Sequence, residues 1–307
     1  MKMKRKALGV VAVLSAVLMW ASSFPLLKFG ILHVPPVTLA AIRYIIAALF
    51  MFVLAIVMRG FDHVMNSFLL SWKRLAVIGL VGFTLPNAAL NLGLELTTAA
   101  TSSVIQASGP AFTILLAVVI LHERLTIRKW IGMVIALIGT ILLVLSQGGN
   151  VNDDLVAGNI LVLLSAVSYS LSGVISKREL AVNEPIIITC WGLITGSLML
   201  CFAIPLEVHE PISISLDVAV LILYLGIFPG CLAFLFYYYI LKDEELSSVS
   251  YFLYLIPLFS TLMAIPLLHE SITLEMIFFG AVIVTGVAIA QYNPPGNRSV
   301  RNGNRKN

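Results

Sequence analysis

The chain has 307 residues, of which 60% are hydrophobic and only 11% are charged, and its formal net charge is +4. Soluble domains average roughly 45–50% apolar and about 25% charged residues, so this composition excludes an ordinary soluble fold, a disordered chain and a disulfide scaffold. The class that remains is an all-α protein that crosses a membrane many times.

Long stretches that are nearly free of charged residues predict the membrane-spanning helices, because each such helix needs about 20 mainly apolar residues. Ten of these stretches follow one another along the chain, joined by short loops. They cover residues 7–27, 36–58, 75–94, 96–121, 130–147, 155–176, 185–206, 218–241, 246–268 and 276–292. The first stretch is longer than the apolar core of a signal peptide, and nine more follow it, so we expect it to be retained.

Basic residues lie on one side of this predicted arrangement. All but two of the 19 lysines and arginines fall in the tails or in loops on the same side as the N-terminus. Cytoplasmic loops are enriched in these residues, so both termini are expected in the cytoplasm. We assign the positive charge to contact with anionic lipid rather than with nucleic acid. Residues 293–307, rich in Pro, Gly, Asn and Arg, are expected to form a disordered basic cytoplasmic tail.

Polar and aromatic side chains recur within the spans at helical spacing, which places them on shared faces. The candidate substrate-binding residues are Trp20, Ser23, Asn87, Asn91, Gln106, Tyr169, Tyr251 and Tyr254. Polar groups are costly in lipid, so these side chains either line a substrate pathway or hydrogen-bond to neighbouring helices. A cavity between the amide-rich third span and the tyrosine-rich eighth span would have one polar and one apolar wall. In the eighth span, Tyr237–Tyr239 lie near the inner interface, which favours a role in an aromatic belt.

Three prolines inside predicted spans are candidate hinges, namely Pro25, Pro110 and Pro257. Proline removes a backbone hydrogen bond and bends a helix, and a static kink is the alternative to a hinge.

Four charged residues are candidates for gating or charge recognition. Arg43 and Lys28, near the outer ends of the second and first spans, either extend to the membrane surface, pair with an acid or bind a substrate carboxylate. Glu123 and Glu270 end the fourth and ninth spans. For these two we consider a latch to a neighbouring helix end and proton coupling, and the absence of Asp or Glu from the middle of the spans weakens the second.

An internal repeat relates the two halves of the chain. When residues 100–126 are aligned with residues 247–273, nine of 27 positions are identical, including Pro110 with Pro257 and Glu123 with Glu270. The repeat unit therefore has five helices, and an odd number forces the two copies into opposite orientations. We expect a first repeat over residues 1–147 and an inverted second repeat over 148–292. Inverted repeats are typical of secondary transporters, whose substrate site lies near the midplane between the repeats.

These segments resemble the drug/metabolite transporter superfamily, in particular its EamA-type members with two five-helix repeats. The resemblance is carried by WASSFPLLK at 20–28, PPVTLAAIRYIIAALF at 35–50, HERLT at 122–126 and its copy HESIT at 269–273. It implies a central cavity lined mainly by the first, third, fourth, sixth, eighth and ninth spans. It also implies transport of amino acids, nucleoside-like metabolites or toxic amphipaths.

The expected function is that of a secondary transporter, an exporter that moves a small amino-acid-like or drug-like solute across the cytoplasmic membrane by alternating access. A translocase of a lipid or a lipid-linked sugar is the alternative. An enzyme is not expected, because HERLT and HESIT lack the second histidine of HExxH and no P-loop is present. No cofactor, metal site or nucleic-acid partner is expected. The partners are the solute and the lipid bilayer, and a monomer suffices because one chain already contains both repeats.

Overall fold

The computed structural model describes residues 2–121, 126–146, 153–208, 212, 214–243, 253 and 255–291. Within these residues the regular secondary structure is helical, and no strand occurs. The first half contains α1 (Lys2–Ile31), α2 (Pro36–Arg59), α3 (Phe61–Gly79), η1 (Leu80–Thr84), α4 (Leu85–Leu96), α5 (Ala99–Gln106), α6 (Gly109–Leu121) and α7 (Ile127–Ser146). The second half contains α8 (Asp153–Glu179), α9 (Pro185–Cys201), α10 (Ile204–Glu207), α11 (Leu216–Ile227), η2 (Phe228–Leu232), α12 (Ala233–Asp243), α14 (Leu255–Leu268) and α15 (Leu274–Gln291).

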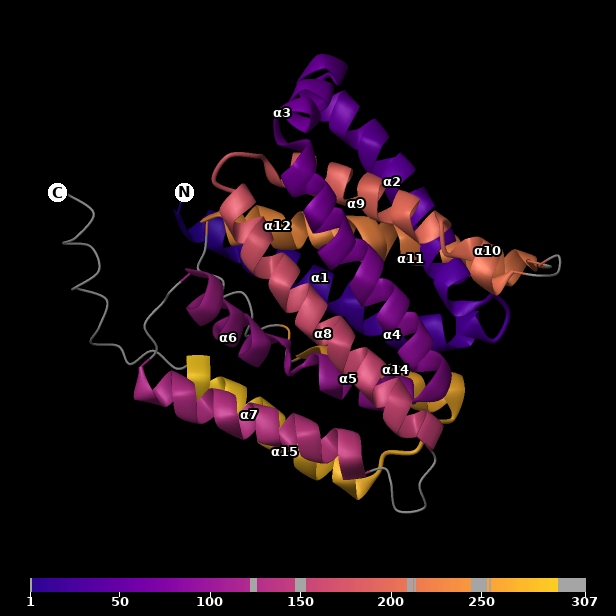
Figure 1. Ribbon diagram of the computed structural model, residues 1–307, viewed down its shortest axis with the longest axis vertical. Coiled ribbons are helices and arrows are strands. Elements are labelled where there is room, and N and C mark those ends of the chain that lie inside the picture. Colours follow the sequence, from indigo (N-terminus) through magenta and orange to yellow (C-terminus); the bar gives the residue numbers. More distant parts are fainter. Residues whose placement is uncertain are drawn as a thin grey trace.

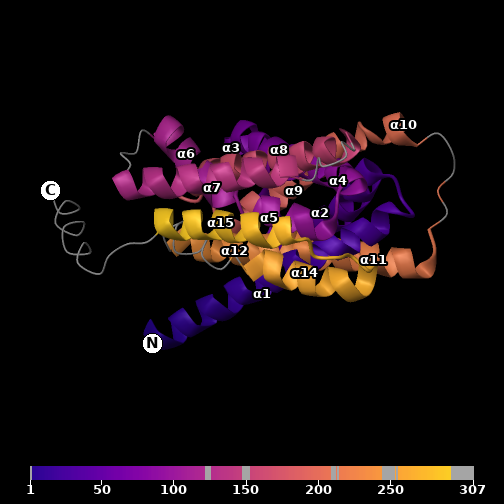
Figure 2. The same ribbon diagram turned by 90° about the horizontal axis from the view of Figure 1, so that it is seen from below.

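Most of these helices form one packed bundle. The α2–α3 hairpin lies at one edge of the bundle, and α7 and α15 lie side by side at the opposite edge (Figure 1). In the second view, the N-terminal end of α1 projects from the body of the molecule (Figure 2). The tail at 293–307, predicted to be disordered, lies outside the described residues.

Six helical segments in the described part of the chain are long and apolar enough to cross a membrane. They are Val11–Ile31, Pro36–Arg59, Phe61–Leu96, Asp153–Glu179, Pro185–Glu207 and Leu216–Lys242. Shorter apolar helices cover Trp130–Leu143, Leu255–Leu268 and Leu274–Gly286. The fourth predicted span is divided between α5 and α6 by a turn at residues 107–108. A total of ten spans and the cytoplasmic location of both termini stay predictions.

The third span begins earlier than the sequence predicts. Residues 61–74, expected in a loop, continue the helix, so that Phe61–Leu96 forms one helical segment of 36 residues. At 1.5 Å per residue its length is about 54 Å, well beyond the ~30 Å hydrocarbon core of a bilayer. The turn that joins it to α2 is made by Gly60, whose φ of 80° favours glycine.

Two short π-helices, η1 and η2, interrupt the third and eighth spans, and a proline accompanies each. In η1 the amide of Leu85 donates to the carbonyl of Leu80, five residues back. At α-helical spacing that amide would reach Val81 instead, and the next residue, Pro86, has no N–H to offer. In η2 the amide of Ala233 likewise donates to Phe228 rather than to Pro229. As a result, the carbonyl of Val81 in η1 and the carbonyl of Pro229 in η2 each lose the backbone donor that an α-helix would provide.

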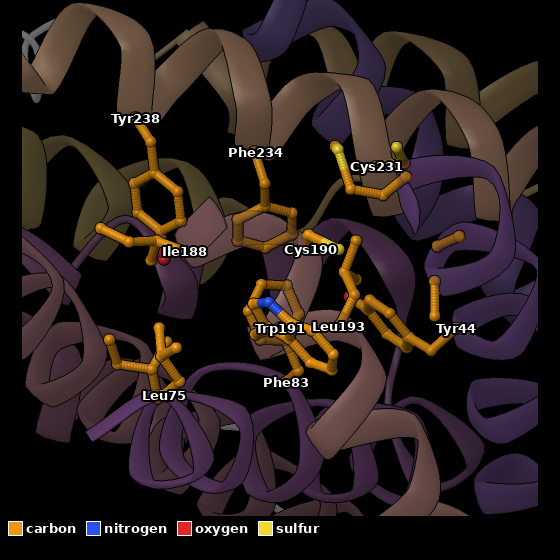
Figure 3. Packing of buried hydrophobic residues seen from close by; sticks show 14 of the residues in the cluster. Tyr44, Leu75, Phe83, Ile188, Cys190, Trp191, Leu193, Cys231, Phe234 and Tyr238 are labelled. Carbon is orange, nitrogen blue, oxygen red and sulfur yellow. The ribbon is translucent and has the colours of Figure 1, made fainter. Parts of the chain in front are cut away.

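Aromatic residues from both halves fill a large part of the core. Figure 3 shows Tyr44, Phe83, Trp191, Phe234 and Tyr238, which come from α2, η1, α9 and α12. The ring centroids of Phe83 and Phe234 are 4.9 Å apart, which joins η1 directly to α12. Cys190 and Cys231 are free and buried in the same cluster.

Small residues allow α7 and α15 to approach closely, as is common where helices pack in membranes. A Cβ atom added at Gly286 would lie 2.5 Å from the amide nitrogen of Ala136 and 2.8 Å from the carbonyl oxygen of Gly132. Both of these are backbone atoms of α7, which cannot move aside as a flexible side chain would.

The substitution Gly286→Ala is therefore expected to lower the thermal unfolding midpoint of the purified protein in detergent, because overpacking costs about 1–3 kcal/mol. The matched control is Gly173→Ala in α8, where an added Cβ meets no atom within 4 Å. That change should raise the midpoint, since alanine is favoured over glycine in a helix by roughly 0.5–1 kcal/mol. Shifts of the same sign in both variants would contradict the packing described for α7 and α15.

Candidate functional site

A cavity of about 190 Å³ lies where helices from the two halves of the chain meet. Its walls come from α1, α4, α5 and α6 in the first half, and from α8, α12, α14 and Leu253 in the second. At ~30 Å³ per water molecule, this volume equals that of about six waters. In this conformation the cavity is therefore of a size to hold a small organic molecule.

The cavity walls differ in polarity. Hydroxyl and amide groups come from α5, α6 and α8, whereas aromatic rings come mainly from α1 and α12. The first group comprises Ser103, Gln106, Thr113, Ser170 and Ser172, and the second comprises Trp20, Phe24, Phe234, Tyr237 and Tyr238. The sequence predicted a polar wall opposite an apolar one, but it assigned the polar wall to the amides of the third span, which lie elsewhere.

Four of the predicted substrate-binding residues line the cavity, namely Trp20, Ser23, Gln106 and Tyr169. The Gln106 side chain donates to the hydroxyl of Ser165 at 2.8 Å. The Ser23 hydroxyl donates to the carbonyl of Trp20, one turn back, at 2.6 Å. Tyr251 and Tyr254, also predicted here, lie outside the described residues.

Asn87 and Asn91 do not line this cavity, and the structure shows them in the other role considered, hydrogen bonding to neighbouring helices. The two residues are only 1% and 0% exposed. The Asn91 amide instead donates to the carbonyl of Pro36, at the start of α2, at 2.8 Å. The side-chain oxygen of Asn91 is buried and has no hydrogen-bond partner among the described residues.

Asn87 joins a buried cluster with Arg43, Tyr44 and Tyr169. Its side-chain oxygen accepts from the Arg43 guanidinium at 2.7 Å, from the Tyr44 hydroxyl at 3.0 Å and from the Tyr169 hydroxyl at 2.9 Å. The guanidinium carbon also lies 4.6 Å from the centroid of the Tyr44 ring. Arg43 is 3% exposed, so it does not extend to the membrane surface, which was one of the predicted alternatives.

Tyr237 and Tyr238 also differ from their predicted role. Both line the cavity rather than an interfacial belt, whereas Tyr239 is 68% exposed. With Phe234, they follow the spacing i, i+3, i+4, which puts all three on one face of α12. That spacing is the signal in the sequence that could have assigned Phe234 to the cavity. For Phe24 and Leu90, we find no comparable signal.

The first helix of each half ends in a lysine that holds the end of another helix. The Lys28 ammonium donates to the carbonyl of Leu94 at 2.5 Å, and the Lys177 ammonium donates to that of Leu241, also at 2.5 Å. In each case the acceptor lies in the last turn of the helix that follows the π-helix, where carbonyls lack helical partners. Lys28 therefore stabilises a helix end, and the two halves repeat the same contact.

Acidic side chains hold two helix N-termini. Glu270 accepts from the amides of Ala99 and Ala100, at 2.8 and 3.0 Å, and so holds the start of α5. Glu207 does the same for α2 through the amides of Val37 and Thr38. The latch was one of the two roles considered for Glu270, whereas no role was predicted for Glu207. Glu123 lies outside the described residues.

The predicted hinge prolines occupy different positions in their helices. Pro25 lies in the interior of α1 and is buried. Pro110 and Pro257 each lie in the first turn of a helix, α6 and α14 respectively, where a proline costs no backbone hydrogen bond. Their role as hinges stays a prediction.

Reciprocal hydrogen bonds connect the two π-helices to the opposite half of the chain. The indole N–H of Trp20 in α1 donates to the carbonyl of Pro229 in η2 at 3.2 Å. The hydroxyl of Ser168 in α8 donates to the carbonyl of Val81 in η1 at 2.8 Å. The two acceptors are the second residues of their π-helices. When Lys28 is matched with Lys177, Ser168 lies one residue before the counterpart of Trp20, so the two contacts are similar in the repeat but not identical. In each case a side chain donates to a carbonyl that the π-helix leaves without its usual backbone donor.

Comparison with known proteins relates the chain to membrane transporters. A sequence profile described as "EamA-like transporter family" matches the chain twice, at residues 7–145 and at residues 156–292. An uncharacterized transporter of Archaeoglobus fulgidus is 28% identical over 88% of this chain and 94% of its own length. The uncharacterized transporter YoaV of Bacillus subtilis is 22% identical, over 91% of this chain and 94% of its own.

Another relative has a more informative name. A protein of Streptantibioticus cattleyicolor called "probable terminal-alkyne amino-acid exporter" is 26% identical over 94% of this chain and 95% of its own length. One solved structure, titled only "Crystal structure of protein", superposes with a TM-score of 0.67 at 22% identity. It covers 92% of this chain and 96% of that one, which shows a shared fold.

The substitution Asn87→Ala is expected to lower the thermal unfolding midpoint, because Arg43, Tyr44 and Tyr169 lose their common acceptor, and the first two are buried. Leaving a buried polar group unpaired costs about 1–3 kcal/mol. The matched control is Asn66→Ala on the exposed face of α3, which should leave the midpoint nearly unchanged. Equal midpoints for the two variants would show that the cluster around Asn87 does not hold the helices together.

Proposed function

We propose that this chain, which belongs to the EamA-like transporter family and is therefore a multi-pass membrane transporter of small solutes, moves an amino-acid-like solute across the cytoplasmic membrane by alternating access. The family and the named relatives are transporters rather than enzymes. In the proposed cycle, two inverted five-helix repeats rock against each other and expose a shared central cavity to either side in turn.

The observation that carries this proposal is the reciprocal pair of hydrogen bonds from Trp20 to η2 and from Ser168 to η1. Similar positions of the two halves make similar contacts, each to the opposite half. Two halves related in this way can exchange conformations, so a contact that closes one side of the cavity has a counterpart that closes the other. Secondary transporters with inverted repeats use this principle.

The contact of Glu270 with α5 supports a closed outer side in this conformation. It joins the end of α14 in the second half to the start of α5 in the first. The distribution of basic residues predicts that this end of the bundle faces the outside of the cell. In the proposed cycle, these two hydrogen bonds break when the cavity opens outward.

The size and walls of the cavity support a small solute with one polar and one apolar part. Pockets for drug-sized ligands measure roughly 300–1,000 Å³, well above the 190 Å³ found here. An amino acid fits this smaller space better than a lipid-linked sugar does. The name of the Streptantibioticus relative supports both the amino-acid class and the direction of export.

Counterflow into proteoliposomes tests the proposal. Liposomes loaded with unlabelled leucine, threonine or phenylalanine should take up the same labelled amino acid faster than protein-free liposomes. The substitution Gly173→Trp places a large ring in the cavity and should reduce this uptake about tenfold or more. Val57→Trp, at a position that is 78% exposed on the outer surface of α2, is the control and should leave uptake unchanged.

The same liposomes are assayed for flipping of a fluorescent phospholipid, which tests the lipid-translocase alternative. Protein-dependent flipping, with no amino acid crossing, would contradict the proposed function and favour that alternative. Uptake that Gly173→Trp and Val57→Trp affect equally would contradict the assignment of this cavity to the solute.

A further inference from the structure

Arg43 carries a positive charge that is almost fully buried and that meets no opposite charge in the described part of the chain. It is 3% exposed, and no described carboxylate lies within ion-pairing distance of it. Its Nε atom is buried with no hydrogen-bond partner among these residues. A guanidinium keeps its proton in proteins, and an unpaired charge inside a membrane is costly. A buried charge of this kind marks a functional site more often than a structural one.

Three acidic side chains at helix ends make contacts with partners other than Arg43. Glu207 accepts from the backbone at the start of α2, and Glu270 accepts from the start of α5. Glu179 lies 3.4 Å from Arg74 and also accepts from Asn183. None of these three carboxylates neutralises Arg43, and a bound anion would supply the missing negative charge.

The side-chain oxygen of Asn87 has more donors than it can serve well. It offers two lone pairs, yet the Arg43, Tyr44 and Tyr169 side chains all donate to it within 3.0 Å. The oxygen therefore has one more donor than it has lone pairs. Of the three, Tyr169 lines the cavity, so its hydroxyl is the donor that a bound solute reaches.

Among the described residues, the cavity lining contains no charged side chain. Its polar groups are the hydroxyls, amides and indole of Ser, Thr, Tyr, Gln and Trp residues. Arg43, which is linked to Tyr169 through two hydrogen bonds to Asn87, therefore makes the electrostatic potential on this wall more positive. In an interior of low dielectric constant, such a charge favours an anionic group in the cavity and disfavours a cation.

We propose that Tyr169 and Arg43 form the recognition site for the carboxylate of the transported solute. The Tyr169 hydroxyl turns from Asn87 to donate to the carboxylate, and the Arg43 guanidinium stabilises that negative charge from behind, with Asn87 and Tyr44 holding it in place. This inference rests on the proposed transport function and narrows its substrates to carboxylates, zwitterionic or anionic. Amphipathic cations are excluded from the site.

Matched acid and amide ligands test this inference on the wild-type protein. The ligands are leucine, threonine and phenylalanine, each beside its primary amide, which has the same side chain but a carboxamide in place of the carboxylate. A further ligand, N-acetyl-leucine, keeps the carboxylate of leucine but lacks the charge of the amino group. Two measurements are made, the inhibition of counterflow in proteoliposomes and the rise in thermal unfolding midpoint in detergent. The acids and N-acetyl-leucine should inhibit and stabilise, and the amides should do neither.

Variants then test which residues cause the preference for acids over amides. Tyr169→Phe should raise the half-saturating concentration of the acids about tenfold or more, because one hydrogen bond to a charged acceptor is lost. The matched control is Tyr224→Phe, since Tyr224 shares a hydrogen bond with Ser22 at 2.9 Å but does not line the cavity. Arg43→Gln should abolish the preference for acid over amide, and Arg43→Lys should retain part of it by keeping the charge.

The outcomes separate the two proposals. If no amino acid crosses or binds, the proposed function is wrong. If amino acids cross but their amides compete equally well, the function stands and the carboxylate site is wrong. Should Arg43→Gln fail to fold, the comparison of Tyr169→Phe with Tyr224→Phe still decides, because equal half-saturating concentrations in these two variants would overturn the role of Tyr169.

Discussion

A backbone carbonyl that loses its helical partner inside a membrane must find another donor within the protein, and the structure depends on this constraint. The π-helices η1 and η2 shift a backbone donor away from Val81 and Pro229. Ser168 and Trp20, each from the opposite half of the chain, donate to these two carbonyls. The irregular backbone in one half is thus stabilised by the first helix of the other, and the halves cannot be described separately.

This arrangement places the aromatic rings and polar groups of the cavity around the same two interruptions. Trp20 contacts η2 and also forms part of the cavity wall, and its ring lies 5.2 Å from that of Phe234. Tyr169 follows Ser168 in α8 and links the cavity to the buried charge of Arg43 through Asn87. A movement of either half therefore alters the cavity wall and the contacts of the π-helices together, which is the coupling that alternating access requires.

Much of this could be predicted from the sequence, because hydrophobic length, basic residues and the repeat each act through a simple rule. The helical class followed from hydrophobic length, and the family followed from the repeat together with the motifs. The position of Trp20 and Tyr169 at the cavity agrees with their selection as polar and aromatic side chains within the spans. The burial of Asn87 behind the cavity could not be predicted, since helical spacing gives a face but not which neighbour covers it. The π-helices were not predicted, for a related reason. Pro86 and Pro229 indicate that a helix is interrupted, but they do not indicate that its backbone hydrogen bonds shift by one residue.

The central claim is that the two halves are inverted copies, and the location of equivalent residues tests it most directly. Thr126 and Thr273 occupy the same position in the two repeats, and both are exposed. Each is replaced by cysteine in a variant that lacks Cys201, and intact cells are treated with a membrane-impermeant thiol reagent. Inverted repeats require labelling of Thr273→Cys in intact cells, and of Thr126→Cys only after the membrane is permeabilised. Labelling of both from the same side would contradict it.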